Sequence, residues 1–130
     1  MVKISSKSIL RFLPSLLWMI VIFYFSSRPT DVIGGSETFR TIFFKSLHLG
    51  EYAVLGALLF FGLKNKLSSI IFGYLYAFTD EFHQNLVLGR HCRFSDTLID
   101  LLGIIIGVTL FKFVLKPLTN KYNKKNKFIS

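Results

Sequence analysis

The sequence is poor in the residues on which many soluble functions depend. It has a single cysteine, Cys92, which excludes an intrachain disulfide and a zinc site built on cysteine pairs. Asp and Glu together number 7, against 16 Lys and Arg. The chain also lacks a phosphate-binding glycine loop, a known hydrolase or zinc-protease spacing, and a basic stripe alternating with aromatic residues. Nucleic acid is therefore not an expected partner.

The chain is instead rich in apolar residues that occur in long runs. Hydrophobic residues make up 52% of the 130 residues, and 15 of them are Phe. The mean hydropathy is +0.51. Long apolar runs with this composition indicate an integral membrane protein. The net charge is +9, and the basic residues lie between and beyond the apolar runs. This placement favours contact with anionic membrane lipids over the binding of nucleic acid.

Four apolar runs predict an all-α, polytopic membrane protein: a four-transmembrane-helix bundle in a single domain over residues 1–130. Helical spans of roughly 18 to 22 residues cover a hydrocarbon layer of about 30 Å. The first run ends without a small-x-small cleavage pattern, so an uncleaved helix is favoured over a signal peptide. The predicted spans cover residues about 10–25, 46–63, 67–87 and 94–115.

The connections between the runs carry further signals. Residues 26–45 form a polar connection, in which Phe39 to Phe44 predict a short helix lying in the membrane interface. Lys64 to Lys66 make a tight polar break. Pro14 is expected near the first turn of the first helix. Pro117 is expected to end the fourth helix, which leaves a basic tail at residues 116–130.

The positive charges predict the orientation. With four spans, the N-terminus, the turn at 64–66 and the C-terminus lie on one side of the membrane, and most Lys and Arg residues are on that side. The positive-inside bias therefore predicts a cell-membrane protein with both termini in the cytoplasm.

In this topology the polar residues of the second, third and fourth helices meet at one membrane depth. Charged groups are costly in lipid, so such residues usually line a protein interior or an aqueous cavity. On the fourth helix a Gly-x-x-x-Gly spacing, Gly103 and Gly107, shares a face with the acids and predicts close helix approach. We therefore predict an outward-facing polar pocket. Its candidate residues are Lys45, His48, Glu51, Tyr52, Asp80, Glu81, Gln84, Arg90, Asp96 and Asp100.

Each residue taken alone also has a structural interpretation. Lys45, Arg90 and Arg93 lie near span ends, where basic residues anchor helices at the interface. His48 could instead be a hydrogen-bonded packing residue. Glu81 and Arg90 could instead form a purely structural ion pair. His83 and His91 are expected to be incidental. The whole set at one depth favours a ligand-binding or catalytic site.

Several of these residues also occur as ordered, spaced elements. The first is Ser26-Ser27-Arg28-Pro29, followed by Lys45, His48, Glu51, Tyr52 and Leu55 in the pattern Lys-x-x-His-x-x-Glu-Tyr-x-x-Leu, then Asp80, Glu81 and Gln84, then Gly89-Arg90, and finally Asp96, Asp100 and Gly103. In this order they resemble the VanZ-like family, small bacterial membrane proteins named for one linked to teicoplanin resistance. The resemblance covers roughly residues 20–110. Asp100 stands where many relatives have Asn, and Leu88 stands in place of the usual Pro.

The resemblance and the pocket together suggest a binding or resistance-type membrane protein. It would act at the outer face on a glycopeptide or a lipid-linked cell-wall precursor. Arg90 and Lys45 would hold an anionic headgroup, because Arg makes paired contacts with phosphate. The remaining substrate-binding candidates are Glu51, Tyr52, Asp80 and Gln84.

The alternative is an intramembrane enzyme acting on a lipid-linked phosphate. His48 with Glu51 or Glu81 would supply acid–base chemistry, and Arg90 would stabilise developing negative charge. A metal variant would use His48, Glu81, Asp96 and Asp100, which offer suitable nitrogen and oxygen ligands. A proton-coupled transporter is a third hypothesis. It is disfavoured without an inverted repeat unless the protein forms homo-oligomers. The identity of any cofactor is left open.

Overall fold

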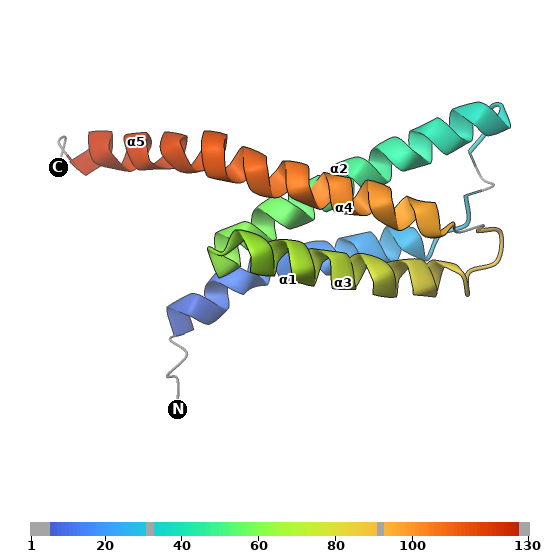
Figure 1. The fold of residues 1–130 in the computed structure, drawn as a ribbon, viewed down its shortest axis with the longest axis horizontal. Helices are drawn as coiled ribbons and strands as arrows, with labels where there is room; N and C mark the ends of the chain where they lie inside the picture. The colour runs from blue at the N-terminus through green and yellow to red at the C-terminus, as the bar shows by residue number, and fades with distance from the viewer. Residues whose placement is uncertain (1–5, 31–32, 91–92, 128–130) are drawn as a thin grey trace.

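The computed structural model describes residues 6–30, 33–90 and 93–127, and all regular structure in these residues is helical (Figure 1). The predicted all-α class is thus confirmed, whereas His91 and Cys92 lie outside the described residues. Figure 1 shows the α1–α2 and α3–α4 connections at one end, here called the loop end, and the α2–α3 turn and α5 toward the other. The elements are α1 (Ser6–Ser26), α2 (Glu37–Leu63), α3 (Lys66–Gln84), α4 (Phe94–Leu110), the π-helical turn η1 (Phe111–Leu115) and α5 (Lys116–Lys127).

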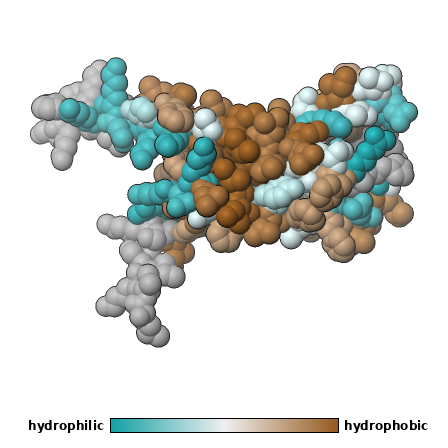
Figure 2. Space-filling view, in the orientation of Figure 1, coloured by the Kyte–Doolittle hydropathy of each residue, from teal (hydrophilic) through white to brown (hydrophobic). Residues whose placement is uncertain are grey.

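Within the residues that the structure describes, three helical segments are long and apolar enough to cross a membrane. They are Ile9–Ser26, Glu37–Leu63 and Phe94–Leu118. Figure 2 shows the corresponding hydrophobic belt in the middle of the molecule, with more polar surface at both ends. The helix α3 is not among the three segments, because its last turns carry Asp80, Glu81, His83 and Gln84. The membrane class is therefore confirmed for the described residues, while the fourth predicted span is not.

The helix α3 buries its polar face and exposes its apolar face, which is the reverse of a helix at a water-exposed surface. Its buried residues include Ser69, Asp80, Glu81 and Gln84. Its exposed large apolar residues are Leu67, Ile71, Phe72, Leu75, Phe78 and Phe82. A helix at a water-exposed surface directs its apolar stripe to the core instead. The polar side of α3 thus faces the other helices.

Glycines allow α2 and α4 to approach closely. A Cβ atom on Gly107 would overlap the carbonyl of Ala53, and one on Gly103 would lie 2.6 Å from the Leu49 carbonyl oxygen. The close approach predicted from the Gly-x-x-x-Gly spacing is therefore confirmed. Gly56 of α2 makes a third such contact with the Ile104 backbone. The buried apolar core around this contact comprises Ile22, Tyr52, Leu55, Leu59, Phe60, Ala77, Ile104 and Val108.

The helix α2 begins at Glu37, nine residues before the predicted start. Ser36 caps it, because the Ser36 Oγ accepts a hydrogen bond from the Phe39 N–H. No proline follows before Leu63, and the helix continues without interruption. The predicted short interfacial helix at residues 39–44 is therefore wrong, and these residues form the first turns of α2.

The break between α2 and α3 agrees with the prediction. Lys64 adopts a left-handed conformation with φ of 55°, and its N–H donates to the Phe60 carbonyl. Asn65 then caps α3 by accepting from the Ser68 N–H at 2.9 Å. The helix α3 ends at Gln84, three residues before the predicted end at residue 87.

The two helix-internal prolines differ from expectation. Pro14 lies well inside α1, because this helix already begins at Ser6. Pro117 does not end the last helix, which continues as α5. The π-helical turn η1 immediately precedes Pro117, and in it the Lys116 N–H donates to the Phe111 carbonyl. The wider turn accommodates a residue that lacks an N–H and whose ring would clash with the carbonyl four residues earlier.

Candidate functional site

Asp80 ties three helices together at the loop end. Its Oδ2 atom accepts hydrogen bonds from the Ser26 Oγ of α1 at 2.9 Å, the Tyr52 hydroxyl of α2 at 3.1 Å and the Gln84 Nε2 of α3 at 2.7 Å. All four side chains are buried. Hydrogen bonds to a carboxylate are stronger than those between neutral groups, so Asp80 fixes the relative positions of these helices.

Gln84 connects this network to Arg90. Its Nε2 donates to Asp80 and, at 3.2 Å, to Ser26, while its Oε1 accepts from the Arg90 Nη1 at 2.7 Å. The donor side of the amide faces Asp80, so the acceptor side must face the guanidinium. Arg90 also donates from Nε to the Arg28 carbonyl at 2.9 Å and from Nη2 to the Phe25 carbonyl at 3.0 Å. The guanidinium is thereby held at the C-terminal end of α1.

His48 of α2 pairs with Asp100 of α4. The His48 Nδ1 lies 3.1 Å from the Asp100 Oδ1, and Asp100 is 1% exposed. An ionised carboxylate only accepts, so Nδ1 carries the proton in that state. The second oxygen of Asp100, Oδ2, is buried without a hydrogen-bond partner in the described part of the chain. The acid that faces the His48 Nδ1 is therefore Asp100, and not Glu51 or Glu81 as the sequence predicts.

A second ion pair joins the same two helices nearer the surface. The Lys45 Nζ lies 3.5 Å from the Asp96 Oδ1. The Asp96 Oδ2 accepts from the Arg93 backbone N–H at 3.4 Å, so Asp96 also satisfies a donor at the start of α4. Both side chains of the ion pair are partly exposed, and exposed pairs stabilise proteins by only about 0–1 kcal/mol.

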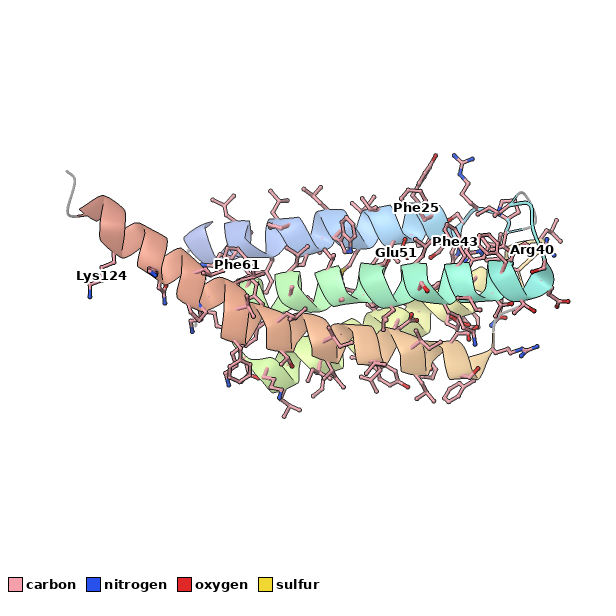
Figure 3. All side chains as sticks on the ribbon, turned by 90° about the horizontal axis from the view of Figure 1, so that it is seen from above. Phe25, Arg40, Phe43, Glu51, Phe61 and Lys124 are labelled. Carbon is pink, nitrogen blue, oxygen red and sulfur yellow. The ribbon has the colours of Figure 1, made fainter. Side chains whose placement is uncertain are left out.

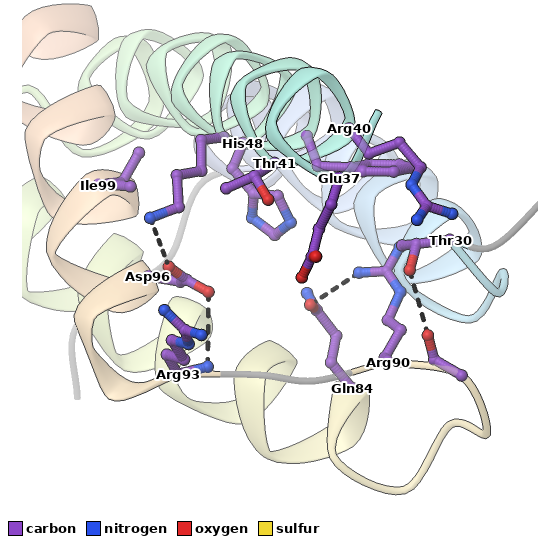
Figure 4. Close-up of a pocket in the computed structure, with 13 residues that line it drawn as sticks. Thr30, Glu37, Arg40, Thr41, His48, Gln84, Arg90, Arg93, Asp96 and Ile99 are labelled. Atoms are coloured by element: carbon purple, nitrogen blue, oxygen red, sulfur yellow. Dashed lines mark hydrogen bonds and ion pairs between the residues drawn. The ribbon is translucent and has the colours of Figure 1, made fainter. Parts of the chain in front are cut away.

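A polar cavity of about 450 Å³ opens at the loop end. Figure 4 shows His48 and Glu37 of α2 pointing into it from one side, with Gln84 and Arg90 on the opposite side. Among the residues that the structure describes, its lining includes four Lys or Arg side chains and two carboxylates, a balance that attracts anions. The lining residues are Thr30, Glu37, Arg40, Thr41, Phe44, Lys45, His48, Gln84, Gly89, Arg90, Arg93, Asp96 and Ile99.

A second cavity of about 430 Å³ adjoins the polar one. It lies between the end of α1, the connection that follows, and the first turns of α2. Figure 3 shows Phe25, Phe43 and Glu51 at this end of the molecule. Phe44, His48 and Arg90 line both cavities. The remaining lining residues, five of them apolar, are Phe25, Ser26, Arg28, Pro29, Ile33, Phe43, Leu47 and Glu51.

The predicted site residues converge at the loop end but take different positions there. Lys45, His48, Gln84, Arg90 and Asp96 line the polar cavity, and Glu51 lines the apolar one. Tyr52, Asp80, Glu81 and Asp100 are buried and line neither cavity.

The metal variant of the site finds no geometric support. Among the residues that the structure describes, no three His, Cys, Asp or Glu side chains lie close enough together to hold a metal ion. The set His48, Glu81, Asp96 and Asp100 is therefore not a metal centre in this arrangement.

Several lining residues were not singled out from the sequence. Glu37, Arg40 and Thr41 precede Lys45 and His48 at intervals of three or four residues, which places all five on one side of α2. This spacing indicates that α2 extends back to Glu37. The prediction of a connection over residues 26–45 concealed it. Ser26 belongs to the Ser26-Ser27-Arg28-Pro29 element of the family resemblance, but no local pattern links it to its partner Asp80, which is 54 residues away.

The fold and the site define a class: a helical membrane protein with a cationic polar cavity at one end. The family model VanZ/LLP1 matches residues 12–115, and the chain belongs to this family. The matched segment includes every candidate site residue, and the resemblance noted in the sequence is confirmed. Comparisons with curated proteins and with solved structures found no match.

Proposed function

We propose that this VanZ-like protein crosses the cell membrane four times, as a single domain with both termini in the cytoplasm and the polar cavity facing outward. Support for a fourth span comes from α3, whose exposed face is apolar and whose polar residues are buried. Such a helix is suited to lipid rather than water. The orientation is supported by the larger number of Lys and Arg residues at the end opposite the loop end.

We further propose that the polar cavity binds an anionic group at the outer face of the membrane. The ligand would be the phosphate of a lipid-linked cell-wall precursor or a carboxylate of a glycopeptide such as teicoplanin. The observation that carries this proposal is the lining, in which Arg40, Lys45, Arg90 and Arg93 outnumber Glu37 and Asp96. Arginine fits phosphate and carboxylate through paired N–H donors. Arg90 is in addition already held in place by Gln84 and two carbonyls.

The test compares charge-neutralised variants of the full chain in phosphatidylcholine nanodiscs. Arg40→Gln/Arg93→Gln removes two cavity cations and leaves the buried Asp80 network intact. Lys64→Gln/Lys66→Gln removes the same charge at the opposite end and is the matched control. We expect the cavity variant to bind undecaprenyl phosphate or teicoplanin about tenfold more weakly, equivalent to about 1.4 kcal/mol. Absence of binding to the unmodified protein, or equal loss in both variants, contradicts the proposal.

A cellular experiment separates the two ligands. If the glycopeptide is bound, expression of the protein lowers teicoplanin susceptibility and Arg40→Gln/Arg93→Gln abolishes the effect. If the precursor lipid is bound, the purified protein binds undecaprenyl phosphate and not teicoplanin. The enzyme alternative gains no support from the geometry. In the form predicted from the sequence, with Glu51 or Glu81 as the partner of His48, it does not match the structure, because Asp100 is the acid at the His48 Nδ1 and Glu81 lines neither cavity.

A further inference from the structure

The two cavities at the loop end differ in chemistry and share one boundary. The polar cavity contains the four cations, whereas the adjoining cavity is lined chiefly by Phe25, Ile33, Phe43 and Leu47. Phe44, His48 and Arg90 form the boundary between them. A pair of adjacent sites, one with a cationic lining and one with a largely apolar lining, matches the two halves of an amphiphile.

We propose that the ligand is a long-chain lipid phosphate that occupies both cavities. The inference rests on the proposed function and names its ligand class. The phosphate lies in the polar cavity, and the first segment of the hydrocarbon chain lies in the apolar one. A phosphate group is costly to bury in lipid and a hydrocarbon chain is costly to expose to water. The ligand must therefore pass from a polar to an apolar site within a short distance, which the shared boundary provides.

Three residues that line the apolar cavity are also exposed at the molecular surface. Phe25, Phe43 and Leu47 are 53%, 37% and 43% exposed. They lie on membrane-length segments of α1 and α2, so their exposed surfaces face the hydrocarbon layer in the proposed topology. A lipid can enter sideways between these helices, and the rest of its chain remains in the bilayer.

Charges at the boundary determine the direction in which the lipid binds. Arg90 stands at the junction and is fixed by its bonds to Gln84 and the end of α1, so little ordering is needed when the phosphate arrives. The lining of the apolar cavity includes both Glu51 and Arg28, whereas the polar cavity contains three further cations besides Arg90, so a phosphate is attracted more strongly to the polar cavity. The headgroup is thus directed toward Arg40 and Arg93, with the chain beside Leu47.

A soluble anion would use only the first cavity. A glycopeptide carboxylate would bind to the cations of the polar cavity, and its binding would not depend on the apolar cavity. The dependence of binding on the apolar cavity therefore distinguishes a lipid phosphate from a soluble ligand.

The test fills the apolar cavity without altering the cations. Leu47→Trp places a large side chain in its lining. Ile42→Trp, at a residue that is 61% exposed on the same helix and lines neither cavity, is the matched control. Undecaprenyl phosphate and inorganic phosphate are each titrated against the full chain in phosphatidylcholine nanodiscs. We expect Leu47→Trp to weaken binding of the lipid at least tenfold and to leave inorganic phosphate binding unchanged, with Ile42→Trp unaffected for both probes.

The outcomes separate this inference from the proposed function. Equal lipid binding by Leu47→Trp and the unmodified protein overturns the chain site while anion binding stands. No binding of either phosphate by the unmodified protein overturns both. A second measurement does not depend on a variant. A lipid phosphate with a diazirine near the start of its chain should label the segment from Phe25 to Leu47, and inorganic phosphate should compete with the labelling. Labelling spread evenly over the lipid-facing helices would contradict the chain site.

Discussion

Asp80 accepts hydrogen bonds from Ser26, Tyr52 and Gln84 through a single carboxylate oxygen. These donors come from three helices, and water does not reach them because their side chains are buried. Through Gln84 the same carboxylate determines where the Arg90 guanidinium lies. The residue is therefore a positioning group for the candidate site rather than a group that contacts the ligand.

Removal of this carboxylate should destabilise the protein. Asp80→Ala removes the shared acceptor of three buried donors, and a buried donor left unpaired costs about 1–3 kcal/mol. Because the Gln84 Nε2 also donates to Ser26, the losses are not additive, and we expect a decrease of about 2–4 kcal/mol in unfolding free energy. Thr79→Ala, at an exposed position on the same helix, should change it by less than about 0.5 kcal/mol. Unfolding by SDS in detergent micelles, followed by circular dichroism, measures both. Equal stability of the two variants would contradict the role given to Asp80.

Asp100 should tolerate an amide better than an apolar residue. In Asp100→Asn the side-chain oxygen can still accept from the His48 Nδ1–H, so we expect a change within about 1 kcal/mol. Asp100→Ala removes this acceptor at a fully buried position and should cost about 1–3 kcal/mol. The same unfolding experiment compares them. A cost for Asp100→Asn equal to that of Asp100→Ala would indicate that the charge on Asp100 is essential.

Among the helices, α2 and α4 approach each other closely because glycines stand at their contact. Gly56, Gly103 and Gly107 each lie where a Cβ atom would meet backbone of the facing helix. Within lipid, helices gain little from hydrophobic burial, so van der Waals contact between closely packed backbones is a main source of association. This contact also sets the spacing between His48 and Asp100 and between Lys45 and Asp96, because each pair bridges the same two helices.

Addition of one methyl group in this contact should separate α2 from α4. Gly107→Ala forces the helices apart because its Cβ atom would overlap the Ala53 carbonyl, and overpacking of this kind costs about 1–3 kcal/mol. Gly50→Ala is the control on α2, since no atom lies within 4 Å of the added carbon. It should be neutral or stabilising by up to about 1 kcal/mol, because Ala favours a helix over Gly. Destabilisation by Gly50→Ala equal to that of Gly107→Ala would contradict this account.

At the scale of the whole molecule, the four-span proposal determines which connections face outward. Single cysteines introduced in a Cys92→Ser background report this through labelling with a membrane-impermeant maleimide. Cysteines in place of Gly34 and Leu88, which are exposed at the loop end, should react in intact cells. Cysteines in place of Lys64 and Lys124 should react only after permeabilisation. Protection of position 88 together with reaction at position 34 would show that α3 does not cross the membrane.

Sequence patterns alone were enough to predict the helical membrane class and the ten candidate residues that gather at the loop end, although not Glu37, Arg40 and Thr41 beside them. Both follow from local pattern, since apolar run length predicts spans and helical spacing places Lys45, His48 and Glu51 on one side of α2. Local sequence patterns also explain why the predictions for the start of α2 and for a helix end at Pro117 were wrong. The cap at Ser36 was outweighed by the polar residues around it, and the π-helical turn that accommodates Pro117 has no signal in composition.

Which polar groups pair, and where the cavities lie, depends on how the helices pack together. Asp100, rather than Glu51 or Glu81, pairs with His48, and Ser26 joins Asp80 across 54 residues of sequence. These choices depend on the rotation and separation of packed helices, which three glycines permit and no single segment encodes. The apolar cavity likewise arises where the end of α1 meets the early turns of α2, so it exists only once both helices are in place.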